Sequence, residues 1–132
     1  MRNLSIFIFL TSVLNVFSQS EKIIGEYEIK TKFEIGITIE YKLSLNSDGT
    51  FLFHFYQDQM CYEDDDRAKG KWTIENDTII FRVNKKTDFD KNHQLDFKKT
   101  KAKFMNGFLK FYESEIFWVN ELELKKKTSY HL

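Results

Sequence analysis

The strongest pattern in this chain is an unbroken alternation of apolar and polar residues over positions 33–45. Successive side chains of a strand point to opposite faces of a sheet, so this segment is predicted to be a strand with one apolar face. Asp48 and Gly49 then favour a tight reversal, and residues 50–57 resume the alternation. The pattern therefore predicts a long aromatic β-hairpin. Its apolar positions are Phe33, Ile35, Ile37, Ile39, Tyr41, Leu43, Leu45, Phe51, Phe53 and Phe55.

Turn residues divide the rest of the chain into further strands. Asn76-Asp77 and Asn106-Gly107 each stand between two short apolar runs, as the turn of a hairpin does. A first strand is expected at residues 24–30 and a last one at residues 116–125, whereas residues 58–69 and 84–94 are predicted to be polar connections. No helix of useful length is expected.

These segments give about eight strands in up-and-down order. The predicted fold class is therefore all-β, an antiparallel meander barrel, with a two-sheet β-sandwich as the alternative. An outer-membrane barrel would also alternate, but residues 95–103 contain four lysines and offer no apolar band for lipid.

The N-terminus resembles a secretory signal peptide. Arg2 precedes a mainly apolar run at residues 4–17, which ends at the polar residues Ser18, Gln19 and Ser20. A membrane anchor is the alternative, but a spanning helix needs about 20 apolar residues and this run is shorter. We therefore expect a leader at residues 1–18 and one domain at residues 19–132, exported to the periplasm or the extracellular space.

Composition limits the possible partners and the sources of stability. The chain has 20 Lys plus Arg and 20 Asp plus Glu, and this balance argues against nucleic acid as a partner. Cys61 is the sole cysteine, so no disulfide forms within the chain, and stability depends on packing. The 14 Phe, 6 Tyr and 2 Trp residues supply rings for that packing. We expect a monomer without a cofactor.

Three short motifs carry a resemblance to a known family. They are Gly25-x-Tyr27, Leu43-x-Leu45-x-x-Asp48-Gly49-Thr50-Phe51 and Gly70-x-Trp72-x-Ile74-x-x-Asp77-x-Ile79-x-Phe81. Together they resemble the small secreted lipocalin-like proteins that are common in Gram-negative bacteria. The resemblance implies an up-and-down barrel that holds a small apolar ligand, although typical lipocalins have tryptophan at the position of Tyr27 and carry disulfides.

The predicted ligand-binding residues are aromatic positions on the expected strands. Hydroxyl and indole N–H groups at such positions orient a ligand, while the rings contact its apolar part. The alternative is that these rings only fill the core, since an eight-stranded barrel is just wide enough for its own side chains. The residues are Tyr41, Phe53, Phe55, Trp72 and Trp118.

Other candidate chemistry is weaker. His54, Met60 and Cys61 are the soft donor set that binds copper, but no second cysteine or histidine follows at ligand spacing. Residues 63–66 are consecutive acids, which favour a solvated loop tip over a calcium site. A basic stripe would form if the strands that carry Lys98, Lys99, Lys101 and Lys103 paired with those that carry Lys125, Lys126 and Lys127.

No motif for nucleophilic, phosphate-binding or zinc-dependent catalysis occurs, so we expect no enzyme. The leading hypothesis is an exported barrel that binds a small apolar or amphipathic ligand in its interior. The alternative is an envelope interaction protein or inhibitor that acts through residues 58–69 and 84–94 on a filled barrel. Copper binding through His54, Met60 and Cys61 is a third hypothesis.

Overall fold

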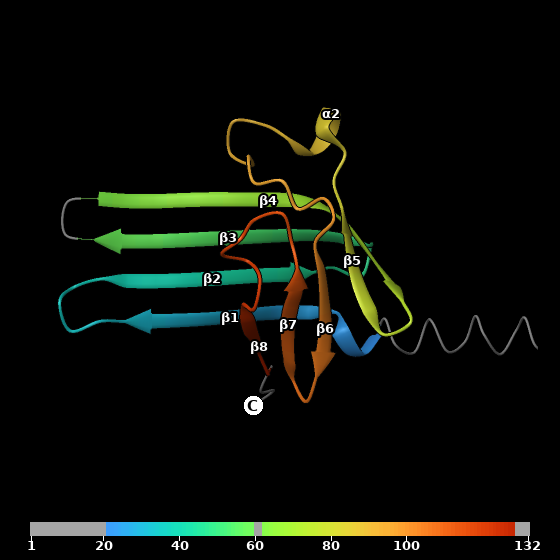
Figure 1. Cartoon of the computed structure of the whole chain (residues 1–132), viewed down its shortest axis with the longest axis horizontal. Helices are drawn as coiled ribbons and strands as arrows, with labels where there is room; N and C mark the ends of the chain where they lie inside the picture. Colours follow the sequence, from blue (N-terminus) through green and yellow to red (C-terminus); the bar gives the residue numbers. More distant parts are fainter. Residues whose placement is uncertain (1–20, 60–61, 129–132) are drawn as a thin grey trace, which may run out of the picture.

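The computed structural model describes residues 21–59 and 62–128, and these form a closed antiparallel barrel with its strands in chain order (Figure 1). Strand β1 pairs with both β2 and β8, which closes the sheet on itself. The predicted eight-stranded meander barrel is thereby confirmed. The strands are β1 (Gly25–Lys32), β2 (Thr38–Leu45), β3 (Thr50–Gln59), β4 (Tyr62–Glu75), β5 (Thr78–Arg82), β6 (Lys101–Met105), β7 (Phe108–Glu113) and β8 (Glu123–Lys126).

The predicted turns join neighbouring strands of this meander. Gly49, between β2 and β3, has φ of 85°, a left-handed conformation that costs glycine little. Asn76 and Asp77 turn β4 into β5 with φ of 50° and 64°. Asn106 and Gly107 turn β6 into β7 in the same left-handed region, with φ of 53° and 84°. Asn and Asp tolerate this conformation better than most residues, which explains why sequence alone located these hairpins.

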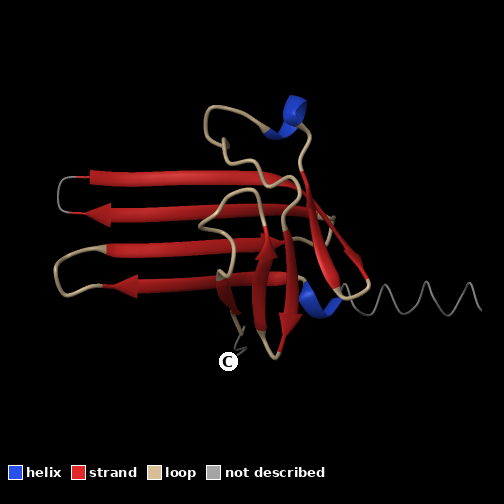
Figure 2. Ribbon diagram, in the orientation of Figure 1, coloured by secondary structure: helices blue, strands red, loops and turns tan. Residues whose placement is uncertain are grey.

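The long strands β1 to β4 extend beyond the closed part of the barrel (Figures 1 and 2). Strand β3 pairs with β4 along its whole length, whereas β5 pairs with β4 over residues 71–75 and β8 pairs with β1 at Tyr27 and Glu28. The distal parts of the four strands therefore form a projecting antiparallel sheet. We call this sheet the wing and define it as residues 29–41, 55–59 and 62–66.

Phenylalanine rings fill the interior of the barrel. Phe97 is fully buried and lies within 4.7 to 6.1 Å, centroid to centroid, of four other rings. It comes from the connection that follows the single-turn helix α2 (Lys85–Asp88), so a loop supplies the centre of the core. Because these rings are in mutual contact, they occupy the space that a ligand would need. The four rings around Phe97 are Phe51, Phe53, Phe81 and Phe111.

The prediction that residues 58–69 form a connection is wrong. Strand β3 runs to Gln59 and β4 begins at Tyr62, so the acidic residues 63–66 lie in a strand of the wing and not at a loop tip. Side chains in this part of β4 alternate between exposed and half-buried, because no second layer of the barrel covers the wing there. A strand without a buried face does not need apolar residues at alternate positions, and periodicity therefore missed it.

Two predicted strands are shorter than expected. Residues 33–37 form a reversal in which the Phe33 N–H donates to the Ile37 carbonyl at 2.8 Å, and Gly36 has φ of 88°. Ile35 is consequently 72% exposed, although its parity predicted an inward position. The last strand covers Glu123–Lys126 and not residues 116–125, because residues 116–121 form turns in front of the long strands. Alternation does not distinguish a turn from a strand when both contain apolar residues.

Close packing in the core leaves no room for a side chain at Gly70. A Cβ atom at Gly70 would overlap the Arg82 carbonyl oxygen and lie 2.8 Å from the Phe51 ring. We expect Gly70→Ala to lower the free energy of unfolding by about 1–3 kcal/mol, the usual cost of an overfilled core. Thr73→Ala, at an exposed position of the same strand, should change it by less than about 0.5 kcal/mol. Urea unfolding monitored by tryptophan fluorescence checks both, and equal midpoints would contradict this close packing.

Candidate functional site

Four of the five predicted ligand-binding residues meet where the barrel opens onto the wing. Tyr41 and Phe55 are paired across β2 and β3, with ring centroids 5.1 Å apart. Trp118, from the connection between β7 and β8, lies 5.1 Å from Phe55 and 6.1 Å from Tyr41. Phe53 lies 6.2 Å from Trp118 and is 1% exposed, so it forms the floor. We call the three half-buried rings of Tyr41, Phe55 and Trp118 the aromatic mouth.

Trp72, the fifth predicted residue, lies elsewhere. Its indole N–H donates to the Asn46 carbonyl at 3.1 Å, and its backbone N–H donates to the Gly49 carbonyl at 2.9 Å. These bonds tie the start of the β4–β5 hairpin to the turn between β2 and β3. The side chain is 6% exposed, which fits a structural role.

The polar atoms of the aromatic mouth differ from those of the structural aromatic residues. The Tyr27 hydroxyl donates to the Ile23 carbonyl at 2.6 Å, and Trp72 is bonded as above. Within residues 21–59 and 62–128, neither the Tyr41 hydroxyl nor the Trp118 indole N–H has a hydrogen-bond partner. Polar groups of half-buried aromatic residues normally find a partner, so these two are available to a bound molecule.

The loop that carries Trp118 contains a further unpaired atom. Asn120 donates from its side-chain nitrogen to the Ser114 carbonyl at 3.1 Å, while its buried side-chain oxygen accepts no hydrogen bond from the described residues. Leaving a buried acceptor without a donor costs about 1–3 kcal/mol. The connection is nevertheless held by the fully buried Val119 and by backbone hydrogen bonds, among them the Glu121 N–H to the Phe111 carbonyl at 3.0 Å.

Strand register places a carboxylate beside the apolar surface of the mouth. Pairing across the four long strands aligns Ile29, Tyr41, Phe55 and Asp66 in one row on the face that continues into the core. Burial, followed by the charges of Asp64 and Asp65, raises the pKa of Asp66. The surface is thus apolar over β1 to β3 and acidic on β4.

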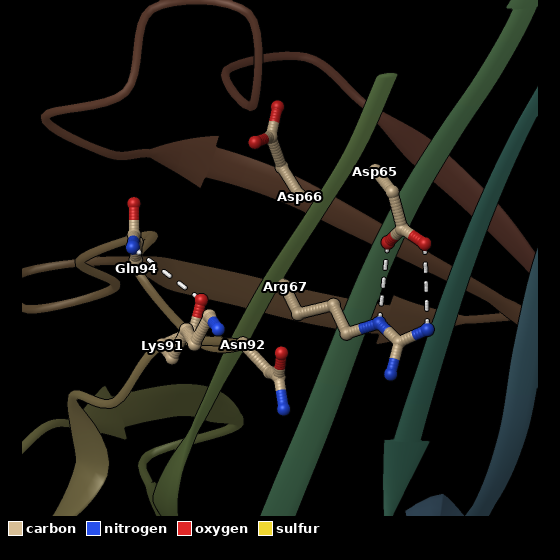
Figure 3. A pocket seen from close by; sticks show the side chains of 6 residues that line it. All are labelled: Asp65, Asp66, Arg67, Lys91, Asn92 and Gln94. Carbon is tan, nitrogen blue, oxygen red and sulfur yellow. Dashed lines mark hydrogen bonds and ion pairs between the residues drawn. The ribbon is translucent and has the colours of Figure 1, made fainter. Parts of the chain in front are cut away.

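A polar pocket of about 370 Å³ lies along the edge of β4 that faces away from β3, between this strand and the connection after α2 (Figure 3). The Leu95 N–H donates to the Arg67 carbonyl at 3.0 Å, and Lys69 pairs with Asp90 at 2.9 Å, so the strand and the connection are fastened together. Segments 58–69 and 84–94, which the sequence separates, therefore share one pocket. Its lining residues are Asp65, Asp66, Arg67, Lys91, Asn92 and Gln94.

The carboxylates at this pocket are strongly paired. Asp65 accepts from the Arg67 Nε at 3.2 Å and lies 2.6 Å from the His54 Nε2. Partial burial opposes its ionisation, but these hydrogen bonds outweigh burial and lower the pKa of Asp65. Hydrogen bonds from Lys69, from His93 and from the Asn92 N–H hold the pKa of Asp90 well below its usual range. Sequence reasoning missed the pairs His54–Asp65 and Lys69–Asp90 because their members are 11 and 21 residues apart, and it missed the local pair Asp65–Arg67 because it interpreted residues 63–66 as a solvated loop tip.

The remaining candidates do not form sites in the described part of the chain. His54 is engaged with Asp65, while Met60 and Cys61 lie outside the described residues. Residues 21–59 and 62–128 contain no group of three or more side chains suited to hold a metal ion. The strand pairing on which a basic stripe depended is not found, because β7 separates β6 from β8. Lys98 and Lys99 instead approach Glu115, and Lys101 approaches Glu113.

Comparisons of the chain with models of protein families, with curated proteins and with solved structures found no match. The class is therefore defined by the fold itself: a closed eight-stranded antiparallel barrel, filled at its centre, with a four-stranded wing. Within the described residues, no helix has the length and apolar character needed to cross a membrane.

Ionisation of two neighbouring aspartates, Asp65 and Asp66, should change the free energy of unfolding in opposite directions. The pKa of Asp66 is raised from 3.8, so its ionisation destabilises the fold as the pH rises through that raised value. Asp66→Asn should therefore increase the free energy of unfolding at about pH 7, by roughly 0.5 kcal/mol after allowance for solvent screening, and change it little at about pH 3.

Asp65 is the matched control for this measurement. Its pKa is lowered, so its stabilising effect is present above the unfolded value and is lost as the pH falls through the folded one. Asp65→Asn should reduce the free energy of unfolding at about pH 7. Urea titrations at both pH values give the signs, and the same sign for both variants would disprove the assignment.

Proposed function

We propose that this protein is a non-enzymatic binding protein that holds a small apolar or amphipathic ligand at the aromatic mouth. The observation that carries the proposal is the pair of unbonded polar groups, the Tyr41 hydroxyl and the Trp118 indole N–H, beside partly exposed rings. Aromatic walls with a few convergent polar groups are the usual lining of a ligand site.

The filled interior sets where such a ligand would lie. Phe53 and Phe97 have ring centroids 4.7 Å apart beneath the mouth, so the ligand contacts the outer side of this layer and does not enter the barrel. The apolar part of the ligand would rest on Phe55 and Trp118 and extend toward Ile39 of the wing. The lipocalin-like motifs support the same class of ligand.

A second function is favoured by the polar pocket. Segments 58–69 and 84–94 meet there, and a hydrogen bond and an ion pair hold them on a solid scaffold. This arrangement supports an envelope interaction protein or inhibitor that binds through the pocket rim. Replacing residues 91–94 by a Gly-Ser linker should then abolish partner capture and leave ligand binding at the mouth unchanged.

The ligand proposal is tested with an apolar fluorescent probe, N-phenyl-1-naphthylamine, and by native mass spectrometry of protein purified from its own host compartment. Loss of an aromatic wall costs about 1.4 kcal/mol or more, so Trp118→Ala should weaken probe binding at least about tenfold. Tyr41→Phe should weaken binding of hydroxyl-bearing ligands by several-fold while it leaves stability unchanged.

Trp72→Phe is the matched control, because Trp72 is an equally large ring that lies away from the mouth. It should lower stability without changing probe affinity. Equal affinity losses in Trp118→Ala and Trp72→Phe, or no loss in either, would remove the mouth from consideration.

We also propose that the protein is exported to the periplasm or beyond after removal of residues 1–18, which lie outside the described residues. The support is the short apolar run at residues 4–17 that follows Arg2. Intact mass measurement of protein from the periplasm of a Gram-negative host should show a mature chain that begins near Gln19. Recovery of the full-length chain from the cytoplasm alone would refute export.

A further inference from the structure

Strand β1 has a free edge along the wing. It pairs with β2 from Gly25 to Lys32, but its pairing with β8 covers Tyr27 and Glu28. Beyond Glu28, within the described residues, no strand lies against the edge of β1 that faces away from β2. Such an edge presents backbone N–H and C=O groups to which an extended segment from another chain adds as a further strand.

A groove of about 640 Å³ follows this edge at the point where β8 turns away from β1. Ile29, 42% exposed, and Phe108, 39% exposed, supply its apolar surface. Lys30 lines one side of the groove, and residues 125–128 line the other. The groove therefore combines unpaired backbone, apolar contact and a concentration of lysines, and it adjoins the surface of the aromatic mouth at Ile29 without including the three rings of the mouth.

Most of the lysines that line the groove are not neutralised by a carboxylate. Lys127 pairs with Glu28 at 3.2 Å, whereas Lys126 donates to the Lys22 backbone carbonyl, which is uncharged, at 2.7 Å. Lys125 has no carboxylate partner among the described residues. Charge complementarity thus favours an anionic occupant.

The nearest carboxylate on the wing does not cancel the charge of Lys30. Glu40 lies 3.6 Å from the Lys30 Nζ but 2.8 Å from the Lys42 Nζ, so it is shared with a second lysine. The opposite edge of the wing, on β4, carries Glu63 and Asp65 and would repel the same occupant. The two edges therefore differ in the partner they accept.

We propose that the groove beside β1 binds an acidic, extended segment of a partner protein, which adds to the edge of β1 as a ninth strand. Carboxylates at alternate positions of the segment face Lys30 and Lys125 on the outer face of the sheet, where Phe108 lies beside Lys125, and the apolar positions between them contact Ile29 on the opposite face. This interaction is independent of the ligand proposed for the aromatic mouth. A lipid surface would use the lysines but leave the backbone edge without a partner, so the edge favours a peptide.

The test uses the full chain and a fluorescein-labelled peptide of alternating glutamate and valine, with binding followed by fluorescence anisotropy. The double variant Lys30→Glu, Lys125→Glu should weaken binding at least tenfold, since it replaces two attractions by repulsions. Lys71→Glu, at an exposed position on β4 away from the groove, is the matched control and should bind as the wild type does. Trp118→Ala should also bind normally, which separates this site from the mouth. Urea unfolding shows that each variant is folded.

The chemistry of the peptide tests strand addition itself. N-methylation of alternate residues removes the N–H donors along one peptide edge, so one of the two methylated registers should lose binding and the other should keep it. Equal binding of both registers, or of a lysine-valine peptide, would overturn the proposal. So would capture by vesicles of anionic phospholipid without peptide binding, or Lys30-dependent self-association through the acidic β4 edge of a second copy.

Discussion

The packing of phenylalanine rings around Phe97 is the interaction on which the rest of this structure depends. The lone cysteine forms no disulfide within the chain, so closure of the sheet depends on burial of apolar side chains. Full burial of one such ring contributes about 1.5–3 kcal/mol, and each of these rings is at most 1% exposed. Since the central ring comes from a loop, the α2–β6 connection is part of the core. The same packing is the reason why the ligand that we propose lies at the opening and not in the interior.

Strands β1 to β4 each have an inner part that closes the barrel and an outer part that projects from it. The inner parts of β1 to β4 curl into the barrel with β5 to β8, while their outer parts continue as a sheet without a second layer. Tyr41 and Phe55 lie at the boundary, where the next residue on the same face of each strand is buried on the barrel side and half-buried on the wing side. This geometry leaves the two aromatic rings half-buried, so partly exposed apolar surface lies at the end of the barrel.

The sequence predicts those parts of the fold in which local chemistry and burial agree. Turns at Gly49 and Asn106 were located because their residues suit left-handed backbone, and β3 because its inner face is buried. Strand β4 was missed where its side chains face water on both sides, and Phe97 was missed because a loop residue has no periodicity. At the site, strand alternation correctly placed Tyr41 and Phe55 on the same face of the sheet. The position of Trp118 beside them depends on the path of the β7–β8 connection, which no sequence pattern predicts.

The opposite charges on the two edges of the wing have an electrical consequence. The formal net charge of the chain is zero, yet Lys30 and Lys32 lie on one flank and Glu63 and Asp65 on the other. Such a molecule carries a dipole moment directed across its sheet, and the field of a charged surface exerts a torque on it. Approach to such a surface is thereby oriented, so that one flank arrives first.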